Sequence, residues 1–172
     1  RILFGGYCPS ADQISQYALG LCDDLVKAGI DAKVVVDLAT ARWKKLIWNI
    51  PFNGLSVVLN ASTQELMESR ESSDLARSLM QEVHCAAGAC GSVMSEQVIQ
   101  TTLDVTREMV PYDSSMRIDY LNKRPMEIEA ILGNPIRHAR AHGCEMPRVE
   151  MLYRELLFLD RQNSVSSRSA ES

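Results

Sequence analysis

Three polar side chains interrupt a largely apolar stretch in the first third of the chain: Lys45, Asn49 and Asn53. Their i, i+4, i+8 spacing places them on one face of a single α-helix. Burying a lysine and two amides costs several kcal/mol unless each is paired. This polar stripe therefore either lines a polar cleft or forms the solvated face of an amphipathic helix, and spacing alone leaves both open. In a cleft, the lysine supplies a cation with a transferable proton, which a reaction that builds negative charge on oxygen requires.

A second group of polar residues lies further along, where Ser114 and Ser115 precede Asp119, and Glu127 follows. We expect Glu127 in the first turn of a helix, with apolar Ile128 directly behind it. A carboxylate at that position is favoured by the helix dipole. On the local pattern alone, the simpler interpretations are that Glu127 only starts a helix and that Ser114 only caps one.

The elements that must position these residues begin with a predicted βαβ unit. Its parts are an apolar strand at residues 2–4, a helix that Gly29 ends, and a β-branched strand at residues 34–36. A capping-box signal at Ser10 and Gln13 precedes the helix. Because two strands bury little without neighbours, we expect them to complete a sheet whose other strands precede this segment.

From residue 39 onward the apolar pattern predicts helix after helix, with no repeat at a fixed period. The first spans about residues 39–59 with a kink at Pro51, and Ser62 with Glu65 caps the second. The later helices are expected to begin near Ser73, Ser95, Ser114, Pro125 and Pro147.

The fold class expected from these elements is mainly α. A short βαβ remnant at residues 1–38 is followed by an all-helical domain at residues 39–162. Residues 163–172 are Ser-rich and carry no apolar period, so we expect a disordered tail there.

Composition excludes several classes of protein. The 172 residues include 18 Lys plus Arg against 22 Asp plus Glu, a formal net charge of −4, with 46% hydrophobic residues. These values are ordinary for a globular protein and exclude collagen-like and disordered chains. The acidic balance disfavours nucleic acid as a partner. No run of about 18 apolar residues is present, so we expect no membrane span.

The five cysteines have irregular spacing and form no C-x-x-C motif. We interpret them as reduced core thiols, which favours the cytoplasm. His138 and His142 are spaced i, i+4 and Cys144 follows them, a spacing that would allow zinc. The simpler interpretation is a solvated basic face near a helix end, so we expect no metal site. The same interpretation applies to a second group, His84, Cys85 and Cys90.

Taken together, the polar motifs resemble those of one enzyme family. The stretch W-K-K-L-I-W-N-I-P-F-N from Trp43 to Asn53 resembles the signature helix K-L-x-x-N-x-x-x-N of the ketopantoate reductases (2-dehydropantoate 2-reductases). Ser114-Ser115-Met116-x-x-Asp119 and Glu127-Ile128-Glu129-x-x-x-Gly133 are similar to that family's S-S-M-x-x-D and E-I-x-x-x-x-G. Each motif alone is weak. In this order and at these spacings they are fairly specific, and the resemblance extends to about Leu157.

The resemblance implies an N-terminal Rossmann domain that binds NADPH and a helical C-terminal domain like that of 6-phosphogluconate dehydrogenase. The active site lies in the cleft between them. The implied reaction is hydride transfer to the 2-oxo carbon of ketopantoate, giving pantoate for pantothenate and coenzyme A. No G-x-G-x-x-G follows a strand in this sequence, and Gly5-Gly6 is no fingerprint. We therefore expect an upstream domain to hold NADPH, and a homodimer formed through the helical domain.

The resemblance also implies residue roles. Lys45 would be the general acid, Asn49 and Asn53 would hydrogen-bond the substrate, Ser115 would hold its carboxylate, and Glu127 would orient the substrate hydroxyl or the lysine. Partial desolvation of a lysine improves it as an acid near neutral pH, whereas a nearby carboxylate opposes that effect.

Two departures bear on the substrate rather than on the reaction class. Thr63 stands where the family usually has Asn, so we expect a substrate hydrogen bond of shorter reach, and Pro51 lies inside the signature helix. Two alternatives stay open: a related 2-hydroxy-acid or polyol dehydrogenase with another substrate, and a non-catalytic helical dimerisation module. We expect the 172 residues alone to be inactive.

Overall fold

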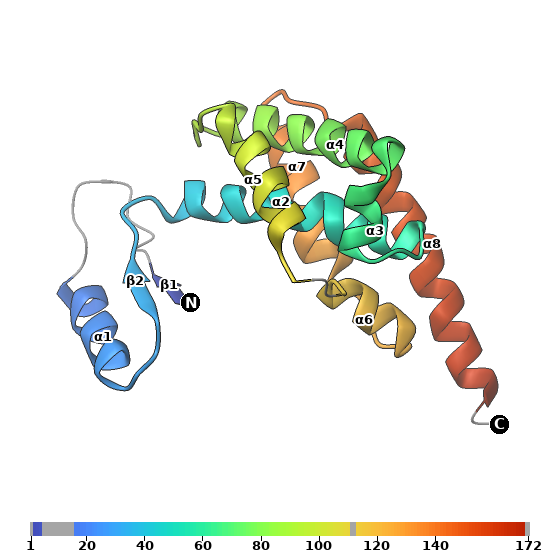
Figure 1. The fold of residues 1–172 in the computed structure, drawn as a ribbon, viewed down its shortest axis with the longest axis horizontal. Helices are drawn as coiled ribbons and strands as arrows, with labels where there is room; N and C mark the ends of the chain where they lie inside the picture. The colour runs from blue at the N-terminus through green and yellow to red at the C-terminus, as the bar shows by residue number, and fades with distance from the viewer. Residues whose placement is uncertain (1, 5–15, 111–112, 171–172) are drawn as a thin grey trace. The chain divides into compact units, whose positions relative to one another are not determined.

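The structure, a computed structural model, describes residues 2–4, 16–110 and 113–170. The chain divides into two units, Arg1–Trp43 and Lys44–Ser172, and each is described by itself. Helices dominate the described residues, and the strands form a two-stranded sheet (Figure 1). The prediction of a mainly α chain with a short βαβ segment is confirmed.

The first unit contains β1 (Ile2–Phe4), α1 (Gln16–Lys27) and β2 (Ala32–Val34). The strands are parallel, in register from Ile2 opposite Ala32 to Phe4 opposite Val34. Gly29 ends α1 with a φ of 79°, a backbone conformation that glycine adopts without steric cost. The second strand lies earlier than predicted, because its pairing stops where β1 ends. The signals at Ser10, Gln13 and Gly5-Gly6 lie outside the described residues.

The second unit is arranged around the C-terminal half of α2 (Leu38–Val58). Residues 50–57 are all buried, which is typical of a helix enclosed by other helices rather than an amphipathic surface helix. Gly54 of this segment lies against Leu152 of the last helix, and the indole N–H of Trp48 donates to Thr106 at 3.1 Å. The helix continues through Pro51. The largest side chains with at most 1% exposure form the centre of the core: Ile47, Ile50, Phe52, Leu66, Met80, Val83, Leu103, Met116, Leu132, Met146, Val149 and Leu156.

The next two helices show how caps set boundaries. α3 (Thr63–Glu68) has the predicted capping box: the Ser62 side chain accepts from the Glu65 N–H, and Glu65 accepts from the Ser62 N–H. α4 (Arg70–Ala89) begins earlier than predicted. Ser69 is its cap and accepts from the backbone N–H of Ser72, whereas the expected cap, Ser73, is buried inside the helix.

The remaining helices follow the predicted order with one change of type. They are α5 (Gln97–Glu108), α6 (Ser115–Leu121), the π-helix η1 (Glu129–Gly133), α7 (Asn134–Ala141) and α8 (Pro147–Ala170). The helix expected from about residue 126 thus begins with a π-helical turn. Such turns are rare and often lie at functional sites.

The predicted disordered tail at residues 163–172 differs from the structure, in which α8 extends to Ala170. Extending an existing helix adds one hydrogen bond for each residue fixed, so a segment without apolar period can continue it. Among the described residues, no helix is long and apolar enough to cross a membrane.

One glycine permits the close approach of α2 and α8. A Cβ at Gly54 would lie 2.9 Å from Cγ of Leu152, closer than real Cβ contacts, and would overlap a methyl group of the same side chain. Leu152 is buried and only 3% exposed, so it has little room to move. The identity of residue 54 therefore limits how closely the two helices can pack.

We expect Gly54→Ala to destabilise the protein by about 1–3 kcal/mol, because overpacking exceeds the gain in helix propensity. Gly88→Ala in α4 is the matched control. Nothing lies within 4 Å of its Cβ position, so the same change should stabilise by about 0.5–1 kcal/mol. Urea unfolding measures both values. Equal free energies of unfolding for the two variants would contradict a tight α2–α8 contact.

Candidate active site

The polar stripe on α2 runs from the surface into the core. Lys45 is exposed, Asn49 is half-buried, and Asn53 is only 2% exposed. Oδ1 of Asn53 is buried and accepts no hydrogen bond. The solvated-face interpretation therefore holds for Lys45 and is wrong for Asn53. A buried acceptor without a donor costs about 1–3 kcal/mol, so this position is poorly explained by folding stability alone.

A buried hydrogen-bond chain joins this stripe to the serine motif. The hydroxyl of Ser56 donates to the backbone carbonyl of Asn53 at 3.1 Å, and the hydroxyl oxygens of Ser56 and Ser114 lie 2.6 Å apart. Ser114 in turn accepts from the backbone N–H of Arg117 at 3.2 Å. Because a carbonyl only accepts and an N–H only donates, the hydroxyl of Ser114 donates to Ser56. The hydroxyls of Ser56 and Ser114 therefore each donate one hydrogen bond and accept one.

Ser114 and Ser115, the two serines of the motif, have different environments. Ser114 is fully buried and caps α6, so the N-cap interpretation is confirmed, while Ser115 is the exposed first residue of the helix. Sequence reasoning missed Ser56. The available signal was its position one helical turn after Asn53, on the same side of the same helix.

Glu127 is exposed and directly precedes the helical turn that starts at Ile128. The backbone carbonyl of Glu127 accepts from the N–H of Ile131 at 3.0 Å, so the residue starts the helix rather than lying within its first turn. Lys45 and Glu127, both described, form no ion pair with each other. The structure thus leaves both charged groups available to solvent.

The second glutamate of this motif, Glu129, is engaged elsewhere. Its carboxylate accepts hydrogen bonds from the Tyr153 hydroxyl and, at 2.7 Å, from the Arg137 guanidinium. These two donors, Tyr153 first, hold the pKa of Glu129 below its usual range. A Cβ at Gly133 would lie 3.0 Å from the Glu129 carboxyl carbon, so the glycine leaves space for this side chain.

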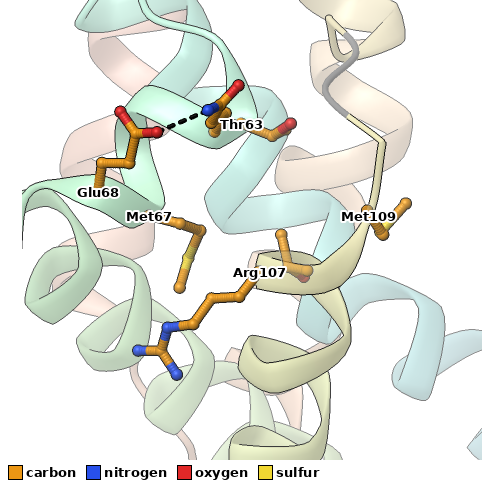
Figure 2. A pocket seen from close by; sticks show the side chains of 7 residues that line it. Thr63, Met67, Glu68, Arg107 and Met109 are labelled. Carbon is orange, nitrogen blue, oxygen red and sulfur yellow. Dashed lines mark hydrogen bonds between the residues drawn. The ribbon is translucent and has the colours of Figure 1, made fainter.

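Thr63 is the predicted site residue that lines a pocket. It is buried, begins α3, and lines an open pocket of about 460 Å³ together with Gln64, Met67, Glu68, Thr106, Arg107 and Met109. Figure 2 shows this pocket, with Arg107 of α5 opposite α3 and the hydrogen bond from Gln64 to Glu68 at 2.6 Å. None of the other five predicted residues lines it. Hydrogen bonds through Ser56 and Ser114 connect the backbone of Asn53 to the serine motif.

One group of side chains could hold a metal ion. Cys90, His138 and His142 bring their ligand atoms within 4.8 Å of one another. The sequence spacing indicated Cys144 as the thiol beside the two histidines, whereas the structure brings Cys90 there from the end of α4. The expectation of no metal site rested on sequence spacing, which did not include Cys90 in this group.

Comparisons with known proteins agree with the motifs. The family model described as ketopantoate reductase PanE/ApbA C-terminal matches residues 37–160. A curated relative, the 2-dehydropantoate 2-reductase of Nostoc sp., is 46% identical over 149 residues, which cover 87% of this chain and 47% of that protein. The chain thus spans about half the length of this relative.

Solved structures give the same result. The crystal structure of 2-dehydropantoate 2-reductase from Methylococcus capsulatus matches with a TM-score of 0.86 and 32% identity, covering 94% of this chain and 51% of that chain. The Geobacter metallireducens GS-15 enzyme matches with a TM-score of 0.83 and 34% identity, covering 93% of this chain and 52% of that one. With the family model matching most of its length, the chain belongs to the ketopantoate reductase PanE/ApbA C-terminal family.

Proposed function

We propose that this chain is the substrate-facing helical domain of a 2-dehydropantoate 2-reductase that reduces ketopantoate to pantoate. The observation that carries the proposal is the unpaired Oδ1 of Asn53, buried at the inner end of the Lys45–Asn49–Asn53 stripe. An acceptor held in this way suits a substrate that brings its own hydroxyl donor. The relatives with the same family domain carry this activity in their names.

The proposed roles follow from the chemistry of ketone reduction. Reduction places negative charge on the former carbonyl oxygen, and the exposed ammonium of Lys45 both stabilises that charge and supplies the proton. Asn49 and Asn53 hydrogen-bond the substrate. Ser115, at the N-terminus of α6, binds the substrate carboxylate, and Glu127 orients the substrate hydroxyl or Lys45. Because Glu129 is held by Tyr153 and Arg137, Glu127 is the carboxylate of the motif that remains for this task.

Thr63 is proposed as a weaker contributor to substrate binding. Because Thr63 lines the pocket between α3 and α5, a direct contact would require a substrate group that reaches that pocket. We therefore expect substitutions at Thr63 to alter the choice of 2-oxo acid more than the rate.

The cofactor that supplies the hydride is proposed to be NADPH. Two structural neighbours are D-mandelate dehydrogenase complexes with NADH, at 20% identity, and they support the fold alone. This sequence has no glycine-rich dinucleotide motif, so its residues give no phosphate cradle of that type. We propose that a nucleotide-binding part of the enzyme, beyond these 172 residues, holds the cofactor, and that these residues alone do not catalyse the reaction.

We further propose a homodimer in the cytoplasm. A solved relative at 25% identity is described as a dimeric ketopantoate reductase from Staphylococcus aureus. The four cysteines that the structure describes are free thiols, consistent with a reducing compartment. Their interpretation as core residues is wrong, because three are half-buried and Cys85 is exposed.

We expect Lys45→Ala, in the gene product that carries this sequence, to lower kcat by about 100-fold or more with ketopantoate and NADPH, because it removes the proton donor. Lys44→Ala is the matched control: Lys44 is the adjacent lysine, also exposed but on a different face of α2, and its loss should leave kcat unchanged. Steady-state kinetics measure both. An unaltered kcat for Lys45→Ala would remove this lysine from the mechanism.

For Asn53→Leu we expect opposite effects on stability and activity. The change removes a buried, unpaired acceptor, so the melting temperature should stay the same or rise. Loss of the substrate hydrogen bond should lower kcat/KM at least about 10-fold. Asn122→Ala, at the exposed C-cap of α6, is the activity control.

Two outcomes would count against this assignment. A strong loss of stability with unchanged kcat/KM would show that Asn53 is structural. Equal kcat/KM for ketopantoate and for 2-oxo acids without a hydroxyl group would favour the alternative of a related dehydrogenase.

A further inference from the structure

A group of thiol and imidazole side chains is gathered where two helices of the second unit end. Cys90 is the C-cap of α4, His138 lies in α7, and His142 is the C-cap of α7. The Sγ atom of Cys90 and one ring nitrogen of each histidine all lie within 4.8 Å of one another. None of these residues belongs to the substrate site proposed above.

The backbone at both helix ends is suited to a cation. Gly91 follows Cys90 with a φ of 83°, and Gly143 follows His142 with a φ of 74°. In this conformation the chain turns away directly after each cap, which is the common glycine termination of a helix. Helix C-termini carry a partial negative charge, so two ends that meet at one point favour a positive ion there.

The hydrogen bonding of His142 fixes which nitrogen can bind a metal. Its Nδ1 lies 2.8 Å from the backbone carbonyl oxygen of His138. A carbonyl oxygen only accepts, so Nδ1 carries the proton and Nε2 keeps its lone pair. A ring N–H that donates to a backbone carbonyl is the usual outer contact of a metal-bound histidine. The two imidazole rings lie with centroids 4.6 Å apart at 61°, an edge-to-face arrangement rather than a stack.

The ligand types select the metal. One thiol and two imidazoles, with no carboxylate in the group, disfavour Mg²⁺ and Ca²⁺ and suit Zn²⁺. In a tetrahedral zinc site the ligand atoms are separated by roughly 3.3–3.6 Å, so side-chain movements of about 1 Å complete the geometry. Both histidines are exposed and Cys90 is half-buried, which gives a metal ion access from solvent.

Two further thiols adjoin the group. Burial, and then the hydrogen-bonded neighbour Cys85, raise the pKa of Cys144, with a smaller influence of Cys90. Burial also raises the pKa of Cys90. A zinc ion at Cys90 would displace the thiol proton. Cys85 and Cys144 form a second possible site for a thiol-binding metal. The test must therefore distinguish binding at Cys90 from binding at Cys85 and Cys144.

We propose that Cys90, His138 and His142 bind Zn²⁺ as three protein ligands, with water in the fourth position, and that the ion links the C-terminal ends of α4 and α7. The link stabilises the helical unit, because zinc binds the folded arrangement and not the separated helices.

The test uses protein stripped of metal with a chelator and then titrated with Zn²⁺, followed by calorimetry and thermal unfolding. We expect one zinc per chain and a higher melting temperature. Co²⁺ as a substitute should give the thiolate-to-cobalt charge-transfer band and the intense d–d bands of a tetrahedral site. Cys90→Ser should abolish the charge-transfer band, and Cys90→Ser and His142→Ala should each weaken zinc binding at least about 100-fold, more than loss of an outer contact.

Matched controls come from the same chain. Cys22→Ser and His84→Ala change the same residue types outside the group, and both should leave zinc affinity unchanged; circular dichroism verifies that each variant is folded. The proposal is overturned if the unaltered protein binds no zinc, or if Cys90→Ser binds it with unchanged affinity. It is equally overturned if the cobalt charge-transfer band persists in Cys90→Ser and vanishes in Cys144→Ser or Cys85→Ser.

Discussion

The burial of residues 50–57 of α2 on all sides is the constraint on which the rest of the second unit depends. A helix enclosed by other helices cannot turn about its axis without disturbing every neighbour, since protein interiors are packed as densely as organic crystals. Gly54 tightens this constraint, because its missing side chain is what lets Leu152 of α8 approach. The direction in which Asn53 points is therefore set by core packing rather than by its own hydrogen bonds. A polar group placed in this way is preorganised before any substrate arrives.

The same constraint explains how two distant motifs reach one place. Ser56 and Ser114 are 58 positions apart, and their buried hydrogen bond ties the first turn of α6 to the middle of the core. The two serine hydroxyls between Arg117 and Asn53 each donate and accept a hydrogen bond. Two buried atoms at the ends of this network have no partner among the described residues: Oδ1 of Asn53 and Nε of Arg117. Arg117 still donates through its other guanidinium nitrogens to Asp113 and Asn60, whereas the side-chain acceptor of Asn53 has no donor, which is more simply explained by function than by poor packing.

Sequence patterns predicted the helices well and their local starts less well. Strong signals such as the Ser62–Glu65 capping box appear as expected, because they depend on residues that are close in the chain. Ser69 rather than Ser73 caps α4, since both serines satisfy the local rule and only packing decides that Ser73 is buried. The spacing of the residues predicted the polar stripe. It did not predict that burial increases along the stripe from exposed Lys45 to buried Asn53. That gradient depends on which helices surround each turn of α2, and spacing along one helix carries no such information.

The pair Glu127 and Glu129 illustrates what only three-dimensional contacts can resolve. In the sequence both lie next to the same apolar residues, and either carboxylate could face a substrate. The π-helical turn at Glu129–Gly133 and the bare backbone of Gly133 direct Glu129 toward Arg137 and Tyr153. A carboxylate that already accepts from a guanidinium and a phenol is held in place and has little capacity left to orient a second partner. Glu127, one residue before the helical turn, has its backbone engaged with Ile131 and its side chain exposed. Where the helix begins thus determines that Glu129 is bound by other side chains and that Glu127 is exposed. Gly133 makes this possible because it leaves space for the Glu129 carboxylate.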